Sequence, residues 1–214
     1  MKKILLSASL ALFLTGCQSA YYSAMEKVGV HKRDILVDRV EEAKESQEVS
    51  QQEFQSALER LSLLINFDGG ELQTVYEELN DDYESSLKAA EDVSNRINKV
   101  EDVAEALFDE WNEELAQYSN ANLKRESEKK LNQTKRQFDK LLRSMRTSEK
   151  KMAPVLSALQ DNVLYLKHNL NAQAISAIKG EFNNLKRDIQ SLMTDMNKSI
   201  ADSNKFIEQM NKTG

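Results

Sequence analysis

The stretch LNQTKRQFDKLLRSMRTSEKKMAPVLSALQDNVLYL, residues 131–166, carries the clearest structural signal in the chain. Along it an apolar residue recurs at every seventh position without a gap: Leu131, Phe138, Met145, Met152, Leu159 and Leu166. A heptad repeat held this long is typical of helices whose apolar side chains insert between residues of a facing helix. The stretch therefore predicts a long helix that packs in a coiled-coil-like bundle.

Heptad repeats continue on both sides of this stretch. Upstream, two interleaved series run through Tyr76, Tyr83, Ala90, Ile97, Ala104, Trp111 and Tyr118, and through Leu72, Leu79, Ser86, Val93, Val100 and Leu107. Downstream, the series are Ile175, Phe182, Ile189 and Met196, with Ile178, Leu185 and Leu192. The first part of the chain is less regular, with Leu36, Val40, Phe54, Ala57, Leu61 and Leu64. We interpret the aromatic residues at heptad spacing as core or interface packing, not as a cofactor site.

Three short breaks interrupt these repeats, at residues 66–70, 119–122 and 168–171. They are rich in Gly, Asn and Ser, which end or cap helices. They divide the chain into four predicted helices: 24–65, 71–118, 121–168 and 172–211. The fold class is therefore all-α: an elongated antiparallel four-helix bundle or coiled coil, up-down-up-down, in a single domain over 24–214. At 1.5 Å per residue, its longest helix would extend about 70 Å.

Two residues inside the predicted helices have local consequences. Pro154 is expected to kink the third helix, because it lacks a backbone N–H and clashes with the preceding turn. Gly180 is expected to allow a close contact along the fourth helix.

Charge is separated between neighbouring segments. Residues 101–114 carry seven acids and no base, whereas residues 124–140 carry seven bases and three acids. A hairpin that turns near Asn120 would lay the two stretches side by side, so that opposite charges set the register. The alternative is that one stripe stays free for a partner or for anionic head groups.

The N-terminus has the pattern of a secretory signal: Met1-Lys2-Lys3, an apolar run from Ile4 to Leu14, and small residues before Cys17. Eleven residues in a helix rise only about 16 Å, too little to span a bilayer. The run Leu14-Thr15-Gly16-Cys17 resembles the lipobox of bacterial lipoproteins. The resemblance implies removal of residues 1–16, diacylglycerol on the Cys17 thiol, acylation (palmitate) of the freed amine, and a lipid-anchored tether over 17–23. The alternative is an ordinary secreted chain with a chance cysteine.

Composition and motifs argue against several classes of function. Removal of Lys2 and Lys3 would change the net charge from −6 to −8, which disfavours nucleic acid as a partner. No phosphate-binding G-x-x-x-x-G-K-[ST] loop is present. The two histidines, His31 and His168, fall near opposite ends of the predicted bundle, so they cannot ligate one metal together. We therefore predict no catalytic residues, no metal site and no cofactor.

The chain is also similar to a known family over most of its length. Residues 21–40, YYSAMEKVGVHKRDILVDRV, resemble the opening of an uncharacterised family of proteobacterial lipoproteins, a helical family with a domain of unknown function (DUF2959-like). The resemblance continues at Phe67-Asp68-Gly69-Gly70 and at residues 166–172, LKHNLNA. It implies an envelope location and a helical fold, but no reaction, cofactor or site.

These patterns predict a non-enzymatic outer-membrane lipoprotein that acts as a helical spacer or interaction scaffold. Lipid on Cys17 would hold it to the membrane, and Gln18, which is not Asp, implies the outer membrane, with the protein facing the periplasm. Phe67, Asp68, His168 and Asn169 would gather at the far end of the bundle and dock a protein partner. Alternatively, these residues merely cap and turn helices.

Two other functions are weighed beside this one. A BAR-like dimeric rod on the membrane could lay a basic face on anionic lipid, which would require a homo-oligomer. An enzyme is the third possibility.

Overall fold

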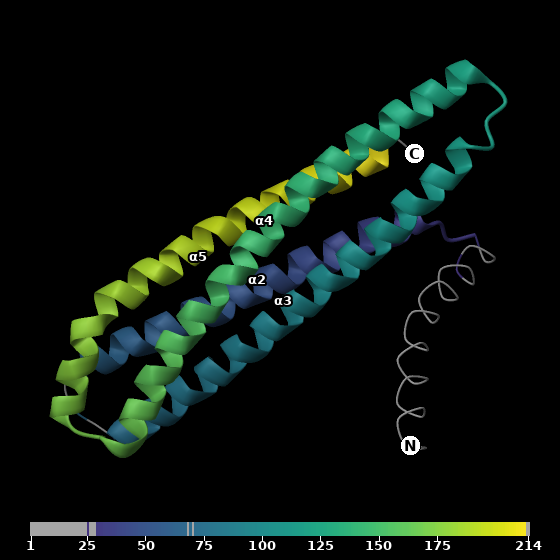
Figure 1. Ribbon diagram of the computed structural model, residues 1–214. Helices are drawn as coiled ribbons and strands as arrows, with labels where there is room; N and C mark the ends of the chain where they lie inside the picture. Colours follow the sequence, from purple (N-terminus) through teal and green to yellow (C-terminus); the bar gives the residue numbers. More distant parts are fainter. Residues whose placement is uncertain (1–24, 26–28, 68, 70, 213–214) are drawn as a thin grey trace, which may run out of the picture.

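The computed structural model describes residues 25, 29–67, 69 and 71–212. Within them the chain forms four α-helices and no strand: α2 (Lys32–Ile65), α3 (Leu72–Leu115), α4 (Ala121–His168) and α5 (Ala172–Lys212) (Figure 1). The predicted bounds of α4 are confirmed, and α5 ends one residue later than expected. The all-α class is confirmed.

The helices form an elongated antiparallel bundle (Figure 1). α2 packs against α3 and α5, and α4 packs against the same two helices, so α2 and α4 lie diagonally across the bundle. The 48 residues of α4 give a rod of about 70 Å at 1.5 Å per residue. No helix in the described part of the chain is long and apolar enough to cross a membrane.

The heptad residues form the core. All six repeat positions of α4 are buried, with at most 5% of each side chain exposed. The six apolar positions predicted in α2 are fully buried as well. In α3 and α5, the core includes Leu79, Val93, Ile97, Val100, Ala104, Leu107, Ile178, Leu185, Ile189, Leu192 and Met196. Other heptad residues are half-buried and pack against this core: Leu72, Tyr76, Tyr83, Ala90, Trp111 and Phe182. Tyr118 is exposed, at 42%, at the end of the rod.

The first predicted helix, 24–65, is interrupted near its start. Met25 is helical, but Gly29 has a φ of +85°, a left-handed conformation that breaks a right-handed helix, and α2 starts at Lys32. Met25 and Val30 pack against the core in front of α2, and the Val30 N–H donates to the Met25 carbonyl. Residue 24 lies outside the described residues.

α4 is one helix through Pro154, and the kink expected there stays a prediction. The close contact expected at Gly180 is wrong: a Cβ built on this residue would have no atom within 4 Å. Gly180 therefore lies in a helix without a packing reason for glycine.

One pair of helices extends beyond the other. Lys32, the first residue of α2, pairs with Glu110 at 2.9 Å, and α3 continues from there to Leu115. Figure 1 shows the α3–α4 turn projecting past the start of α2 and the end of α5. The bundle thus has a hairpin end, formed by α3 and α4, and a far end with the α2–α3 and α4–α5 turns.

Candidate functional site

The residues predicted to dock a partner lie in the two turns at the far end of the rod (Figure 1). Phe67 is half-buried and His168, the last residue of α4, is exposed. Asp68 lies outside the described residues. Both turns therefore occur at one end, as predicted, with Phe67 from one turn and His168 from the other.

The asparagines at this end bond to backbone groups at the ends of helices. The Asn169 side chain donates to the Tyr165 carbonyl at 2.9 Å, which closes the last turn of α4. Asn171 Oδ1 accepts from the N–H groups of Gln173 and Ala174, both at 3.0 Å, which confirms it as the cap of α5. Asn169 thus fits the capping alternative, whereas the His168 side chain makes no hydrogen bond within the described part of the chain.

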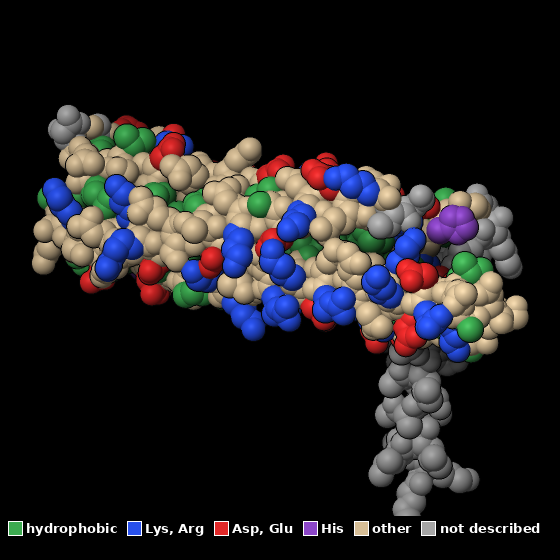
Figure 2. Space-filling model, turned by 90° about the horizontal axis from the view of Figure 1, so that it is seen from above, with side chains coloured by type: hydrophobic (Ala, Val, Ile, Leu, Met, Phe, Trp, Pro, Cys, Tyr) green, Lys and Arg blue, Asp and Glu red, His purple; other side chains and the backbone are tan. Residues whose placement is uncertain are grey.

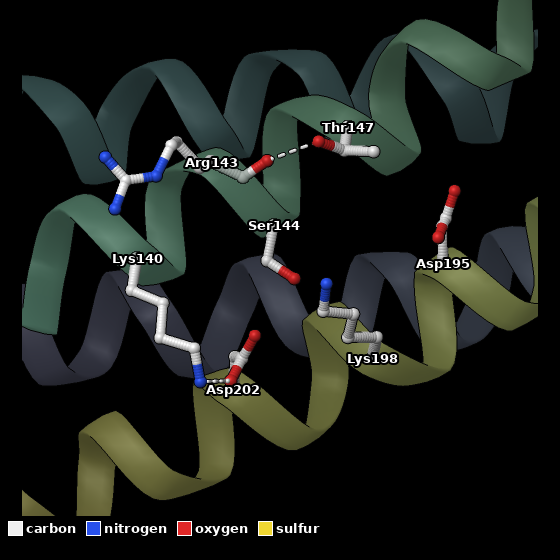
Figure 3. A pocket seen from close by; sticks show the side chains of 7 residues that line it. All are labelled: Lys140, Arg143, Ser144, Thr147, Asp195, Lys198 and Asp202. Carbon is white, nitrogen blue, oxygen red and sulfur yellow. Dashed lines mark hydrogen bonds and ion pairs between the residues drawn. The ribbon is translucent and has the colours of Figure 1, made fainter.

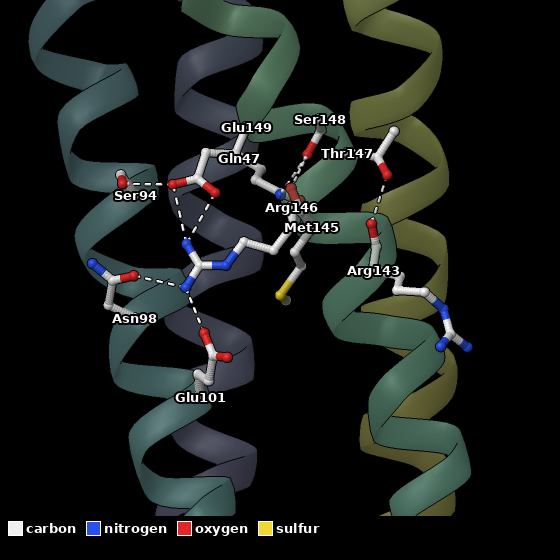
Figure 4. Close-up of polar contacts among 10 residues, drawn as sticks. All are labelled: Gln47, Ser94, Asn98, Glu101, Arg143, Met145, Arg146, Thr147, Ser148 and Glu149. Carbon is white, nitrogen blue, oxygen red and sulfur yellow. Dashed lines mark hydrogen bonds and ion pairs between the residues drawn. The ribbon is translucent and has the colours of Figure 1, made fainter.

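A band of small polar residues interrupts the apolar core. Six polar residues are buried because they occupy positions that point inward: Gln47, Ser50, Ser86, Ser148, Ser199 and Ser203. Gln47 donates from Nε2 to Ser148 Oγ at 3.1 Å, across the diagonal between α2 and α4 (Figure 4). Gln47 Oε1 and Ser199 Oγ have no hydrogen-bond partner among the described residues. This polar band, which the sequence reading missed, links helices that are not direct neighbours.

A cavity of about 260 Å³ opens between α4 and α5. Its walls are polar: Lys140, Arg143, Ser144, Thr147, Asp195, Lys198 and Asp202 (Figure 3). Lys140 Nζ lies 2.8 Å from Asp202 Oδ1, while Ser144 Oγ and Asp202 Oδ2 are buried without a partner in the described part of the chain. Burial alone would raise the pKa of Asp202, but the hydrogen bond from Lys140 and the charges of Lys140 and Lys198 lower it below its ordinary value.

The arrangement in this cavity supports charge pairing and hydrogen bonding. Three cations and two carboxylates line it, so its charges nearly balance. Lys151 extends the same seam by pairing with Asp195 and by donating to Ser191 at 2.8 Å. We therefore interpret the cavity as part of the polar seam that joins α4 to α5.

Arg146 joins α3 to α4 (Figure 4). Its guanidinium donates to both carboxylate oxygens of Glu149, to Asn98 at 2.7 Å and to Glu101 at 2.6 Å. Ser94 of α3 also donates to Glu149, at 2.6 Å. Burial would lower the pKa of Arg146, but the hydrogen bonds to Glu101 and Glu149 raise it above its ordinary value. The cluster fixes the rotation of α4 against α3.

Several ion pairs of the two oppositely charged stretches lead to residues outside these stretches. Glu110 pairs with Lys32 of α2, and Lys140 pairs with Asp202 of α5. Glu101 does pair with α4, but through Arg146, beyond the basic stretch. The contacts that set the register between α3 and α4 therefore differ from the predicted pairing of residues 101–114 with residues 124–140.

One face of the rod carries a band of Lys and Arg side chains, with Asp and Glu beside them (Figure 2). α4 as a whole has twelve bases and five acids. Several of its bases are paired within the bundle, through Lys140, Arg146 and Lys151. Part of the positive charge of α4 is therefore neutralised within the bundle.

The hairpin end has an apolar groove. It measures about 650 Å³, and its apolar lining consists of Leu107, Trp111, Tyr118, Leu123 and Met210. Arg33, Lys130 and Lys212 are among its charged lining residues. The Trp111 indole donates to Ser127 at 2.9 Å, which ties the two helices of the hairpin together. The aromatic residues at 111 and 118, predicted as packing, thus belong to a surface that is partly open.

The sequence predicts no metal site, and such a site would need several ligating side chains close together. Within the described ranges, no group of three or more His, Cys, Asp and Glu could hold a metal ion. His31 directly precedes α2 and His168 ends α4, so the two histidines lie at opposite ends of the rod. Cys17 lies outside the described residues.

Comparison with known families gives two matches. The family described as "Protein of unknown function (DUF2959)" matches residues 21–210. The pattern described as "Prokaryotic membrane lipoprotein lipid attachment site" matches residues 1–18, a range that includes Cys17. Among the curated proteins and the solved structures, none matches the chain.

Proposed function

Since the chain belongs to the DUF2959 family and is a membrane-anchored lipoprotein of the cell envelope, we propose that it is a non-enzymatic spacer or interaction scaffold. In this proposal the lipid on Cys17 holds the hairpin end near the membrane. The rod carries the far end outward, where a protein partner binds.

The observation that carries this proposal is the separation of the two ends. Cys17 precedes α2 by fifteen residues, and α2 begins at the hairpin end. The turns with Phe67 and His168 lie at the opposite end of a rod about 70 Å long. A tether at one end and exposed turns at the other are what a spacer requires.

The proposed location is the outer membrane, facing the periplasm. Gln18 follows the cysteine, where an aspartate would mark retention in the inner membrane by resemblance to lipoprotein sorting in enteric-type bacteria. Two or three acyl chains would give stable anchoring, whereas a single chain binds only weakly and reversibly.

The far end supports docking through Phe67 and His168 more than through the asparagines. Phe67 presents an apolar ring that is half-buried, and His168 is exposed. Asn169 bonds to its own helix. We therefore place the docking surface on Phe67 and His168, with Asp68 as its acidic neighbour in sequence.

Photo-crosslinking in cells tests the proposal. A photoreactive residue at His168 is expected to give a discrete protein adduct, and one at Glu91, which is exposed along the middle of the rod, is expected to give none. Phe67→Ala should reduce the adduct at 168 without changing helicity or melting temperature. Equal adducts at both positions, or an adduct that Phe67→Ala leaves unchanged, would contradict docking at the far end.

A second candidate function is a BAR-like dimer that lies flat on anionic lipid. The observation in its favour is the excess of bases on α4 and the band of Lys and Arg on one face (Figure 2). Analytical ultracentrifugation separates the two, because this function requires a dimer whereas the spacer can act as a monomer. The neutralising pairs of Lys140, Arg146 and Lys151 favour the spacer.

A further inference from the structure

We propose that the tip of the α3–α4 hairpin, residues 115–125, is a second membrane contact that rests on the interface of the bilayer holding the lipid anchor. The inference deepens the proposed spacer, because such a contact would stand the rod on its end. The tip is defined here as LAQYSNANLKR, from Leu115 to Arg125.

The tip is a rigid, exposed surface. Every residue from Ala116 to Arg125 is exposed, including Leu123 at 58% and Tyr118 at 42%. Asn120 Oδ1 accepts from the N–H groups of Asn122 and Leu123, at 2.9 and 3.3 Å, and so caps α4. Leu123 is therefore presented by the capped first turn of α4, and Tyr118 by the turn that precedes it.

The chemistry of the tip suits a membrane interface. Over its eleven residues it has no acid, and Lys124 and Arg125 give it positive charge. Tyr is enriched at membrane interfaces, and Lys and Arg keep their charged ends at head-group level while their stems cover apolar surface. Anionic head groups would add attraction to the two bases. Of the two far-end turns, the α2–α3 turn differs, since residues 66–71 contain Asp68 and Glu71 and no base.

The acids behind the tip limit how deep it can go. Glu113 and Glu114 on α3, and Glu126 on α4, flank the tip at its base. Four residues of helix rise about 6 Å, so deeper entry would strip water from these carboxylates at high cost. The contact is therefore shallow and interfacial.

The tether allows this contact. Met25, which packs against the core in front of α2, follows Cys17 by eight positions, and a fully extended chain of that length reaches about 27 Å. Lys32 lies level with Glu110, to which it bonds. From Glu110 to Tyr118 the rod extends only about 12 Å further. The tip is thus well within reach of the bilayer that holds the lipid.

Two alanines offer matched positions for a test. Ala121 and Ala172 are each the first residue of a helix, each exposed, and each preceded by a capping asparagine. Ala121 lies at the hairpin end of the rod and Ala172 lies at the far end. Since Cys17 is the only cysteine and carries the lipid, a cysteine placed at either position would be labelled alone.

The experiment uses the full lipoprotein in vesicles of phosphatidylethanolamine and phosphatidylglycerol that contain a nitroxide head-group lipid. The fluorophore on Ala121→Cys should be quenched and shifted to the blue, and the fluorophore on Ala172→Cys should not. Adding Tyr118→Asp and Leu123→Asp should reduce quenching at 121 to the level seen at 172. The matched change Leu63→Asp, at another exposed leucine, should leave it unchanged.

The outcomes separate this inference from the proposed function. If neither fluorophore is quenched, the tip contact is wrong and the spacer stands on its tether alone. If both are quenched equally, the rod lies flat, and both the tip contact and the upright spacer are wrong. Quenching at 121 that survives the two aspartates would also overturn the contact, because it would not depend on the apolar side chains.

Discussion

Replacement of Phe138 tests whether the core packs as described. This ring lies on α4 and is 5% exposed. Its centroid is 5.6 Å from Phe108 of α3 and 6.0 Å from Phe206 of α5, both with edge-to-face geometry. One side chain thus joins three helices close to the hairpin end. In a rod only two helices thick, no further layer can fill the space that its loss would leave.

The expected loss follows from two contributions. A buried Phe→Ala change removes apolar contacts and leaves a cavity, which typically lowers the free energy of unfolding by about 3–5 kcal/mol. Each edge-to-face pair adds about 0.5–1.5 kcal/mol beyond the area it buries. Phe138→Leu keeps most of the volume but loses both ring pairs, so we expect a loss of about 1–3 kcal/mol from them.

Urea unfolding of residues 18–214, followed by far-UV circular dichroism, measures these losses. The exposed Leu123→Ala serves as the control and should change stability by no more than about 0.5 kcal/mol. Combining Phe138→Leu with Phe206→Leu should give a coupling free energy in the range of one ring pair. A Phe138→Ala variant as stable as the control, or zero coupling with Phe206, would refute this packing.

Four further outcomes are expected. Gly180→Ala should raise the free energy of unfolding by about 0.5–1 kcal/mol, because the site is helical and open, and urea unfolding measures it. Burial alone would raise the pKa of Asp202, but the hydrogen bond and charge of Lys140 lower it by more, so the folded-state pKa lies below the ordinary value. The Asp202 carboxylate therefore stabilises the fold above its ordinary pKa, and this contribution is lost as the pH falls through the lowered pKa. The stability difference between wild type and Asp202→Asn should therefore be larger at neutral pH than in acid, in unfolding curves at both. Small-angle scattering of residues 18–214 should give a radius of gyration well above the roughly 16 Å of a compact domain of this length. A palmitate analogue should label the protein but not Cys17→Ser, and a soluble, unlabelled wild type would contradict lipidation.

The long helices could be predicted because their signal is redundant. Six heptad positions of α4 agree with one another, and a single substitution would not hide the period. The ends of α4 were also predictable, because Asn120 and Asn171 mark the helix starts on either side. The start of α2 was not, because the left-handed conformation of Gly29 is a property of one glycine without a turn motif around it.

The polar band was missed for a different reason. Positions 40, 43, 47, 50, 54 and 57 alternate by three and four residues, so Gln47 and Ser50 occupy core positions of an unbroken heptad. A search for apolar residues alone reads them as a gap in the pattern. The spacing was a usable signal, and it would have identified both residues as buried.

The partners of the charged residues could not be read from the sequence. Lys140 could face α3 or α5, and the rotation of α4 about its own axis decides which acid it meets. That rotation depends on packing of the apolar knobs and on Arg146, which engages Glu101 and Asn98. Opposite charge predicted that pairs would form, but not between which helices.

The polar band connects the fold to the proposed function. A bundle with a wholly apolar heptad core can slide by one heptad and still bury apolar surface. The bond between Gln47 and Ser148 spans the diagonal and is kept only in one register. Sliding would leave the Gln47 amide buried without this partner, whereas Ser148 would keep its bond to the Met145 carbonyl. The register fixes how far the hairpin of α3 and α4 extends past α2, and thus how far the tip stands from the tether. A protein that uses both ends of a rod has reason to hold that offset constant, and the buried glutamine and serine do so near the middle of α2 and α4.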